Sequence, residues 1–186
     1  MVKTIRLAAE IQPDSILDGE GIRTIIWTQG CSHNCFGCQN PQTHSFEGGF
    51  LKDIEELKAE LKSLEYQDGI TLSGGDPLFQ IDACLEISKY AKSIGLNVWC
   101  YTGFLFEDLL EMSKKNKKLL QLLETIDVLV DGPFLLEQKS YDVVFRGSKN
   151  QRILDVKKSL SLKKAYEIPK YSSQKESFVK RECIFV

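Results

Sequence analysis

Three cysteines that lie close together have the clearest chemistry in this sequence. Cys31, Cys35 and Cys38 occur in the stretch TQGCSHNCFGCQNPQTH with C-x3-C-x2-C spacing, and both histidines of the chain, His33 and His44, lie beside them. Thiolates and imidazoles are the usual protein ligands of zinc, and thiolates those of iron–sulfur clusters. Three thiolates are one fewer than a closed structural site uses, and an open position is typical of catalytic metal sites. The spacing leaves the source of the fourth ligand open.

The cysteine loop has three interpretations. In the first, His33 or His44 completes a structural Cys3His zinc site, although such sites usually come as two separated ligand pairs. In the second, the thiols are ordinary buried cysteines, which a loop rich in Gly, Asn, Pro and Ser disfavours. In the third, the thiolates bind an iron–sulfur cluster, whose ligands come in closely spaced runs. In that case we expect the two histidines to shape the loop rather than to bind metal.

A second unusual group, Gly74, Gly75 and Asp76, lies in the motif SGGDP directly after a short apolar run. Adjacent glycines let the backbone approach a ligand closely, and their carbonyls can accept a hydrogen bond from an ammonium group. An isolated Gly-Gly pair usually marks an ordinary turn. Its place after a strand, beside a cysteine loop, favours a binding role.

Strand-like and helix-like segments alternate from residue 22 onward and must position these motifs. β-branched and aromatic runs predict the strands, and apolar residues at helical spacing predict the helices. We expect strands at 22–29, 69–73, 96–102 and 126–131, and helices at 52–65, 79–95 and 105–125, the last with a break near 114–118. This order predicts an α/β fold with a parallel sheet and outer helices. A complete (β/α) barrel takes about 250 residues, so an incomplete, open (β/α) barrel of parallel strands is expected.

The unusual segments fall after strands. The cysteine loop follows the first expected strand, SGGDP the second, YTGF the third and DGPF the fourth. Ligands in such sheets bind at the carboxyl ends of the strands. All four segments are therefore expected on one rim.

Composition limits the class of protein. The 186 residues are 42% hydrophobic, which is enough to form a hydrophobic core. The net charge of −2 does not indicate nucleic acid or a membrane surface as a partner. The sequence shows no signal peptide and no apolar run near the about 20 residues of a membrane span. Clustered cysteines indicate metal binding in a reducing compartment rather than disulfides. A cytoplasmic location is therefore expected.

We expect one domain over residues 1–165, followed by a basic C-terminal tail, 166–186. Residues 157–186 contain eight Lys/Arg against three Glu, which is typical of a solvated end, with a docking surface as the alternative. Cys84 and Cys100 fall in apolar segments and are expected in the core, and Cys183 in the tail has no evident role.

Several motifs together resemble those of the radical S-adenosylmethionine enzymes, whose fold is a partial TIM barrel. Within that superfamily, the stretches DGEGIRTIIWTQGCSHNCFGCQNPQTH, LSGGDPL, VWCYTGF, IDVLVDGPF and FRGSKNQRILDV resemble the activating proteins of anaerobic ribonucleoside-triphosphate reductases. The motifs extend from Asp18 to Val156, about three quarters of the chain.

The resemblance implies one [4Fe-4S] cluster held by Cys31, Cys35 and Cys38, with the amino and carboxylate groups of S-adenosyl-L-methionine on the fourth iron. Reductive cleavage of this cosubstrate then gives methionine and a 5′-deoxyadenosyl radical. The radical removes a hydrogen atom from a glycine of the reductase and leaves a glycyl radical there. Cofactor and cosubstrate supply this chemistry, and the protein supplies position and exclusion of water, so no side chain is expected to act as a catalytic acid or base.

The resemblance also implies contacts to the cosubstrate. Gly74 and Gly75 are expected beside the methionine amino group, with Asp76 adjacent at a position where many relatives have Glu. Gly37 stands where the wider superfamily often has an aromatic residue near adenine, so the backbone of Gly37 and Gln39, on either side of the third cysteine, is the expected adenine contact.

Further contacts are expected at two other strand ends. Tyr101, Thr102 and Asp131 are expected to line the adenosine or methionine part, although Asp131 before Gly-Pro is equally typical of a turn. The segment Arg146–Arg152 is expected to be a clamp over the cosubstrate, a docking surface for the reductase or a solvated turn.

The partners implied by the resemblance are the glycyl-radical subunit of an anaerobic ribonucleoside-triphosphate reductase and, as electron donor, a reduced flavodoxin or ferredoxin. Three alternatives stay open. They are activation of another glycyl-radical enzyme such as pyruvate formate-lyase, a small-molecule reaction in deazapurine synthesis, and a zinc-stabilised binding module.

Overall fold

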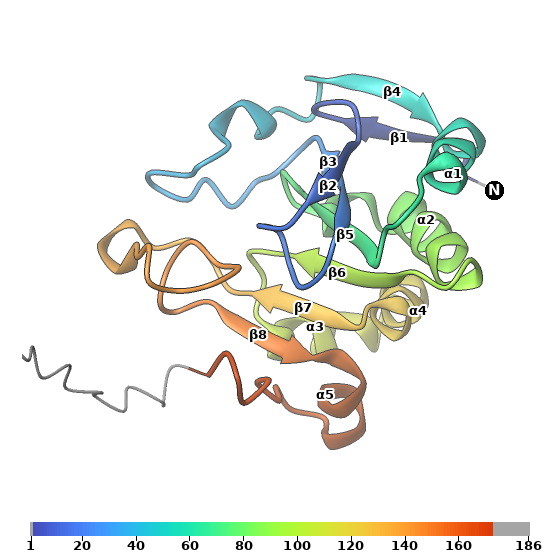
Figure 1. The fold of residues 1–186 in the computed structure, drawn as a ribbon. Coiled ribbons are helices and arrows are strands. Elements are labelled where there is room, and N and C mark those ends of the chain that lie inside the picture. Colours follow the sequence, from blue (N-terminus) through green and yellow to red (C-terminus); the bar gives the residue numbers. More distant parts are fainter. Residues whose placement is uncertain (1, 173–186) are drawn as a thin grey trace, which may run out of the picture.

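One mixed sheet holds the functional loops in the computed structural model, which describes residues 2–172 (Figure 1). Within these residues the sheet has eight strands in the order β4-β1-β3-β5-β6-β7-β8, and β2 pairs with β3. The strands are β1 (Thr4–Leu7), β2 (Gln12–Ser15), β3 (Arg23–Thr28), β4 (Phe50–Asp53), β5 (Gly69–Gly74), β6 (Asn97–Tyr101), β7 (Val128–Asp131) and β8 (Arg152–Asp155).

The four predicted strands form the parallel centre of the sheet, β3-β5-β6-β7. Their carboxyl ends meet at one edge, where Thr28 pairs with Gly74 and Tyr101 with Val130. The predicted parallel sheet is confirmed for these four strands, whereas the strands that were not predicted, β1, β2, β4 and β8, pair antiparallel at its margins. A parallel pair needs a crossover connection, usually a helix, and the loop from β7 to β8 contains only one short 3-10 turn before the chain runs back.

The helices follow the strands as expected. They are α1 (Ile54–Ser63), α2 (Ile81–Ser93), α3 (Phe106–Ser113), α4 (Lys117–Thr125) and α5 (Val156–Leu162), with 3-10 turns η1 (Pro41–Thr43), η2 (Pro77–Gln80) and η3 (Leu136–Gln138). The predicted break near 114–118 is confirmed, because the Asn116 side chain caps α4 by accepting from the Lys118 and Leu119 amides. Helix 52–65 was predicted two residues too early, since Lys52 and Asp53 complete β4.

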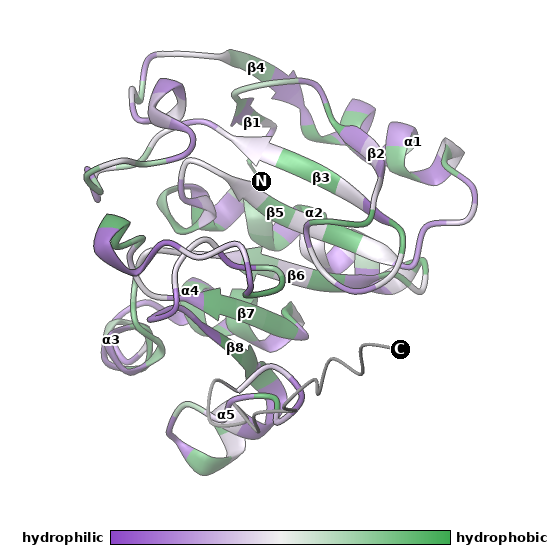
Figure 2. Ribbon diagram, turned by 60° about the vertical axis from the view of Figure 1, so that its left-hand side comes forward, coloured by the Kyte–Doolittle hydropathy of each residue, from purple (hydrophilic) through white to green (hydrophobic). Residues whose placement is uncertain are grey.

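The sheet has an apolar cluster on each face. On β6, Val98 and Cys100 point to the large cluster under the helices, and Trp99 and Tyr101 belong to a smaller one on the opposite face. This alternation follows from the two-residue period of a strand. Figure 2 shows the apolar character of β6 and β7 as green colour along both strands. Cys84 and Cys100 are fully buried in the large cluster, as predicted, and burial raises the pKa of both thiols.

The chain after α5 continues along the sheet. Glu167 forms an antiparallel bridge with Leu154, and the Ile168 amide donates to the Ile153 carbonyl at 2.9 Å. The expected tail over 166–186 therefore begins with residues that pack against the domain. Its remainder from residue 173, including Cys183, lies outside the described residues. In the described part of the chain, no helix has the length and apolar character that crossing a membrane requires.

Candidate active site

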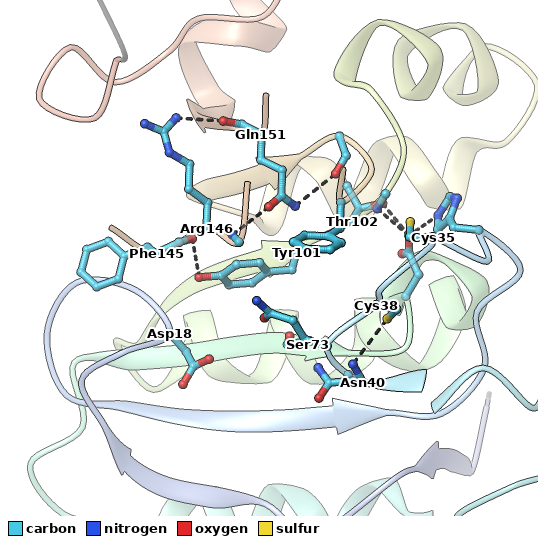
Figure 3. A pocket seen from close by; sticks show the side chains of 18 of the residues that line it. Asp18, Cys35, Cys38, Asn40, Ser73, Tyr101, Thr102, Phe145, Arg146 and Gln151 are labelled. Carbon is cyan, nitrogen blue, oxygen red and sulfur yellow. Dashed lines mark hydrogen bonds and ion pairs between the residues drawn. The ribbon is translucent and has the colours of Figure 1, made fainter. Parts of the chain in front are cut away.

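A cavity of about 620 Å³ opens where the parallel strands end (Figure 3). This volume is in the range of small-molecule sites. Its walls come from the loops after β3, β5, β6 and β7, so the predicted rim is confirmed. The cavity brings together most of the predicted site residues: Cys31, Cys35, Cys38, Gln39, Gly74, Gly75, Asp76, Tyr101 and Thr102.

The cysteine loop is folded mainly by its own backbone. The Cys31 amide donates to the His44 carbonyl at 3.1 Å, and the Cys38 amide donates to the Cys35 carbonyl at 3.1 Å. The Asn40 amide donates to the Cys38 Sγ at 3.4 Å, a bond of the kind that tunes cluster sulfur ligands. All three thiols are partly exposed to the cavity side, and partial burial raises the pKa of the Cys31 thiol.

Asp76 connects this loop to the next two strands. Its carboxylate is 1% exposed; Oδ2 accepts from the His33 ring at 2.7 Å, from the Thr102 hydroxyl at 2.8 Å and from the Gly103 amide at 2.9 Å. The Leu78 amide donates to Oδ1 at 2.9 Å. One buried carboxylate thus joins the ends of β5 and β6 to the cysteine loop.

His33 shapes the loop, as expected. Besides its bond to Asp76, its ring packs edge-on against Phe104 at 4.6 Å and lies 5.6 Å from Phe79. Such a ring is not available as a metal ligand through the nitrogen that faces Asp76.

Gly74 and Gly75 pack directly against the backbone of β3 and the residue after it. A Cβ at Gly74 would lie 2.4 Å from the Thr28 oxygen, and one at Gly75 would lie 2.5 Å from the Gly30 oxygen. Real Cβ atoms do not approach backbone so closely, and Gly74 also has φ +105. Both glycines are therefore required by the fold where they line the cavity.

The donor set of the cavity is dominated by thiols, which suits an iron–sulfur cluster. Among residues 2–172, no group of three or more His, Cys, Asp or Glu is arranged to hold one metal ion. Three thiols nevertheless line one cavity, and thiolates are the ligands of such clusters. His33 and His44 line the same cavity, but the His33 Nε2 lies 2.7 Å from Asp76 and is not free to complete a Cys3His zinc site.

Two predicted residues, Asp131 and Gly37, are not among those that line the cavity. Asp131 is fully buried; its carboxylate accepts from the Phe106 amide at 2.8 Å and from Arg152 Nε at 2.9 Å. The hydrogen bond to Asp131 is also the main reason why the pKa of Arg152 is raised. Asp131 therefore fixes β8 and α3. Gly37 faces the Leu136 side chain, which would lie 3.0 Å from an added Cβ.

A further wall of the cavity was not predicted in detail. Residues from Lys139 to Gly147 line it, together with Gln151, and the loop after β2 adds Leu17 and Asp18. Tyr101 donates its hydroxyl to the Phe145 carbonyl at 2.9 Å, and burial raises the pKa of Tyr101. The signal that could have found this wall is the length of the β7–β8 loop, since loops this long are commonly functional.

The segment Arg146–Arg152 is a self-bonded turn that contributes to this wall. The Gln151 Oε1 accepts from the Gly147 amide at 2.9 Å, and the Asn150 Nδ2 donates to the Pro133 carbonyl at 2.7 Å. Arg146, Gly147 and Gln151 of this segment line the cavity, which is compatible with a clamp over the cosubstrate.

Comparison with known proteins gives consistent matches. The profile of the family described as 4Fe-4S single cluster domain matches residues 17–154. The anaerobic ribonucleoside-triphosphate reductase-activating protein of Haemophilus influenzae is 35% identical over 149 residues, which are 76% of this chain and 92% of that protein. The proteins of the same name from Salmonella typhimurium and Enterobacteria phage T4 are 34% and 33% identical, covering 75% and 77% of this chain and 92% and 90% of theirs.

Among solved structures, the crystal structure of QueE from Escherichia coli aligns with 54% of this chain and 52% of that chain. The TM-score is 0.46 and the identity 16%, a match too partial to define the fold.

Proposed function

This chain belongs to the family of the anaerobic ribonucleoside-triphosphate reductase-activating proteins, and we propose that it installs a glycyl radical on such a reductase. The matches cover about nine tenths of the length of these relatives. The observation that carries the proposal is the meeting of the three cysteine thiols and the Gly-Gly-Asp backbone on one cavity.

We propose that Cys31, Cys35 and Cys38 hold one [4Fe-4S] cluster, in keeping with the matching 4Fe-4S domain family. The chemistry supplied there is one-electron cleavage of S-adenosyl-L-methionine to methionine and a 5′-deoxyadenosyl radical. The protein's own residues bind and orient the cosubstrate and keep water away from it.

The proposed binding roles follow the cavity wall. The backbone of Gly74 and Gly75 lies beside the methionine part, and Asp76 holds that backbone against the cysteine loop. The backbone of Gln39 and the Thr102 side chain line the same cavity and are proposed contacts of the adenosine part. Asp131 and Gly37 have no place in this set.

The fold supports the proposal in outline. We assign the four parallel strands with helices on one face to an incomplete, open (β/α) barrel, because β4 and β8 end the sheet without pairing to each other among the described residues. A reduced flavodoxin or ferredoxin is the proposed electron donor, and the cytoplasmic location stays a prediction. The same cluster could also serve activation of a pyruvate formate-lyase-type enzyme or a reaction on a small molecule. Neither of these activities is the one that the relatives' names give.

The first test is an EPR spectrum of anaerobically reconstituted, dithionite-reduced protein, recorded without and with S-adenosyl-L-methionine. A [4Fe-4S]⁺ signal whose g-values shift on addition supports the proposal. Zinc without inorganic sulfide in the purified protein would refute it and leave a zinc-stabilised binding module.

A variant pair tests the ligand assignment. Cys31→Ala should lose the cluster and form no 5′-deoxyadenosine. Cys84→Ala is the matched control, because Cys84 is buried in the core and donates to the Pro77 carbonyl, and it should keep its iron. Cleavage of the cosubstrate by Cys31→Ala would contradict the assignment.

A further inference from the structure

The cavity wall formed by residues 139–147, here called the 139–147 wall, is a loop closed at its base. Lys139 bridges Ser148, and the Ser140 amide donates to the Gly147 carbonyl at 3.3 Å. Its tip is open to solvent, with Tyr141 89% and Val144 54% exposed. A loop of this kind has its position set by the residues that connect it to the rest of the protein.

Phe145 and Arg146 make that connection, and both meet Tyr171 near the end of the described chain. The Phe145 and Tyr171 rings are 5.8 Å apart, and both pack nearly perpendicular to Trp99 at 5.5 and 6.3 Å. The Arg146 guanidinium donates to the Tyr171 carbonyl at 2.9 Å and to the Gln151 carbonyl at 2.8 Å. Edge-to-face rings and charge-assisted bonds are both directional, so they fix the position of what they join.

The backbone of Phe145 shows that the wall is held rather than relaxed. Phe145 has φ +55, a left-handed conformation that is unusual for an aromatic residue and persists only where surrounding contacts determine it. In this conformation its carbonyl accepts from the Tyr101 hydroxyl, which lies in the cavity, as Figure 3 shows. The contacts of Phe145 therefore act on the shape of the cavity.

The segment that ends at Tyr171 is itself anchored at two points. We call residues 168–171 the C-terminal strap. Its Ile168 amide donates to the Ile153 carbonyl of β8, and Lys170 Nζ forms an ion pair with Glu20 at 2.6 Å. Glu20 follows Leu17 and Asp18, which also line the cavity. The strap therefore connects the segment that contains Glu20 to Phe145 and Arg146 of the 139–147 wall.

We propose that the C-terminal strap is part of the cosubstrate site, with Tyr171 and Arg146 as positioning residues that hold the 139–147 wall against the adenosyl ligand. This inference rests on the proposed function, because it takes S-adenosyl-L-methionine as the ligand of the cavity. A wall that occupies its binding position only one tenth of the time raises the apparent Kd about tenfold. The strap thus contributes to affinity without touching the reacting atoms.

Tyr171→Ala tests the proposal because it removes the ring and keeps the carbonyl. Hydrogen exchange of peptides covering 139–147, measured on the reconstituted protein without cosubstrate, should become about tenfold faster. Equilibrium dialysis with S-adenosylhomocysteine, which cannot be cleaved, should show a Kd about tenfold higher. The KM for S-adenosyl-L-methionine should rise similarly while kcat for 5′-deoxyadenosine formation is retained.

Two further variants separate this role from a general loss of structure. Tyr171→Phe keeps the ring and should restore both exchange and Kd. Tyr166→Ala is the matched control, because its ring lies over Lys158 at 4.8 Å and not against the wall, and it should leave both values unchanged.

The proposal is overturned if exchange of the 139–147 wall is the same in Tyr171→Ala and wild type, or if exchange rises while the Kd stays constant. If the wild-type protein binds no adenosyl ligand, the proposed function is refuted instead. Faster exchange in Tyr171→Ala would in that case still show that the strap holds the 139–147 wall in place.

Discussion

Replacing Asp76 by Asn should destabilise the protein and loosen the cysteine loop. The carboxylate accepts four hydrogen bonds at a site that is 1% exposed. The Asn side chain has one acceptor oxygen, whereas the carboxylate has two. If that oxygen faces His33, Thr102 and Gly103, the new amide group faces the Leu78 amide, and a buried donor is left without an acceptor.

The magnitude follows from these four bonds. An unsatisfied buried donor costs about 1–3 kcal/mol, and turning three charge-assisted bonds into neutral ones costs about 1 kcal/mol each. Removing a buried charge recovers part of this, about 2 kcal/mol. The net loss is about 2–4 kcal/mol, which lowers the Tm of a domain of this size by about 4–16 °C.

The assay combines thermal unfolding by circular dichroism with iron and sulfide analysis after anaerobic reconstitution. Asp76→Asn should lower both the Tm and the iron content, because the bond from His33 is a direct tie between Asp76 and the loop of Cys31 and Cys35. Asp82→Asn is the control, since Asp82 lies on an exposed face of α2 with Lys118 as its ion-pair partner, and surface changes are usually within about 0.5 kcal/mol. An Asp76→Asn variant with the Tm and iron content of wild type would refute the reasoning.

Three other changes have distinct expected results. Gly75→Ala places a Cβ 2.5 Å from the Gly30 oxygen, so urea unfolding should show a loss of about 1–3 kcal/mol. Asp131→Asn breaks a buried pair with Arg152 and should lower the free energy of unfolding by about 3 kcal/mol while leaving the KM for cosubstrate unchanged. A raised KM in a variant of full stability would show instead that Asp131 takes part in binding the cosubstrate. Arg152 lowers the pKa of Glu107 below 4.5 by hydrogen bonding, so Glu107 stabilises the fold above that pH and the contribution is lost as pH falls through the folded pKa. Because Glu107 is 52% exposed, Glu107→Gln should cost at most about 0.5 kcal/mol at pH 7 and nothing at pH 2, by urea unfolding at both pH values.

The central strands could be predicted because each is marked locally. A β-branched run such as IRTIIWTQ predicts a strand without reference to anything distant, and all four parallel strands were found in this way. The strands β1, β4 and β8 are four residues each, as β7 is, but only β7 contains a run of three apolar residues that marks it as a strand. The other three form because neighbouring strands pair with them, as β7 does with β8. Such pairing cannot be predicted from either segment alone.

The same distinction separates the predicted site residues that line the cavity from those that do not. Cys31, Cys35, Cys38 and the Gly-Gly-Asp motif were found because their spacing along the chain is itself the signal. Asp131 was misplaced because Asp-Gly-Pro looks like a strand-end turn whichever way its side chain points. Its partner Arg152 is 21 residues away and reaches it only after the chain has reversed direction.

The two glycines show how the packing of the fold and the site depend on each other. In the sequence, Gly74 and Gly75 suggest close approach to a ligand. In the structure their closest approach is to the protein itself, because the end of β5 packs on Thr28 and Gly30 with no room for a Cβ. The Asp76 amide then donates to the Gly30 carbonyl at 3.0 Å, one residue before Cys31. The glycines therefore bring the wall proposed for methionine to the loop proposed for the cluster, and a side chain at either position should disturb the cluster site even if the ligand never contacts that side chain.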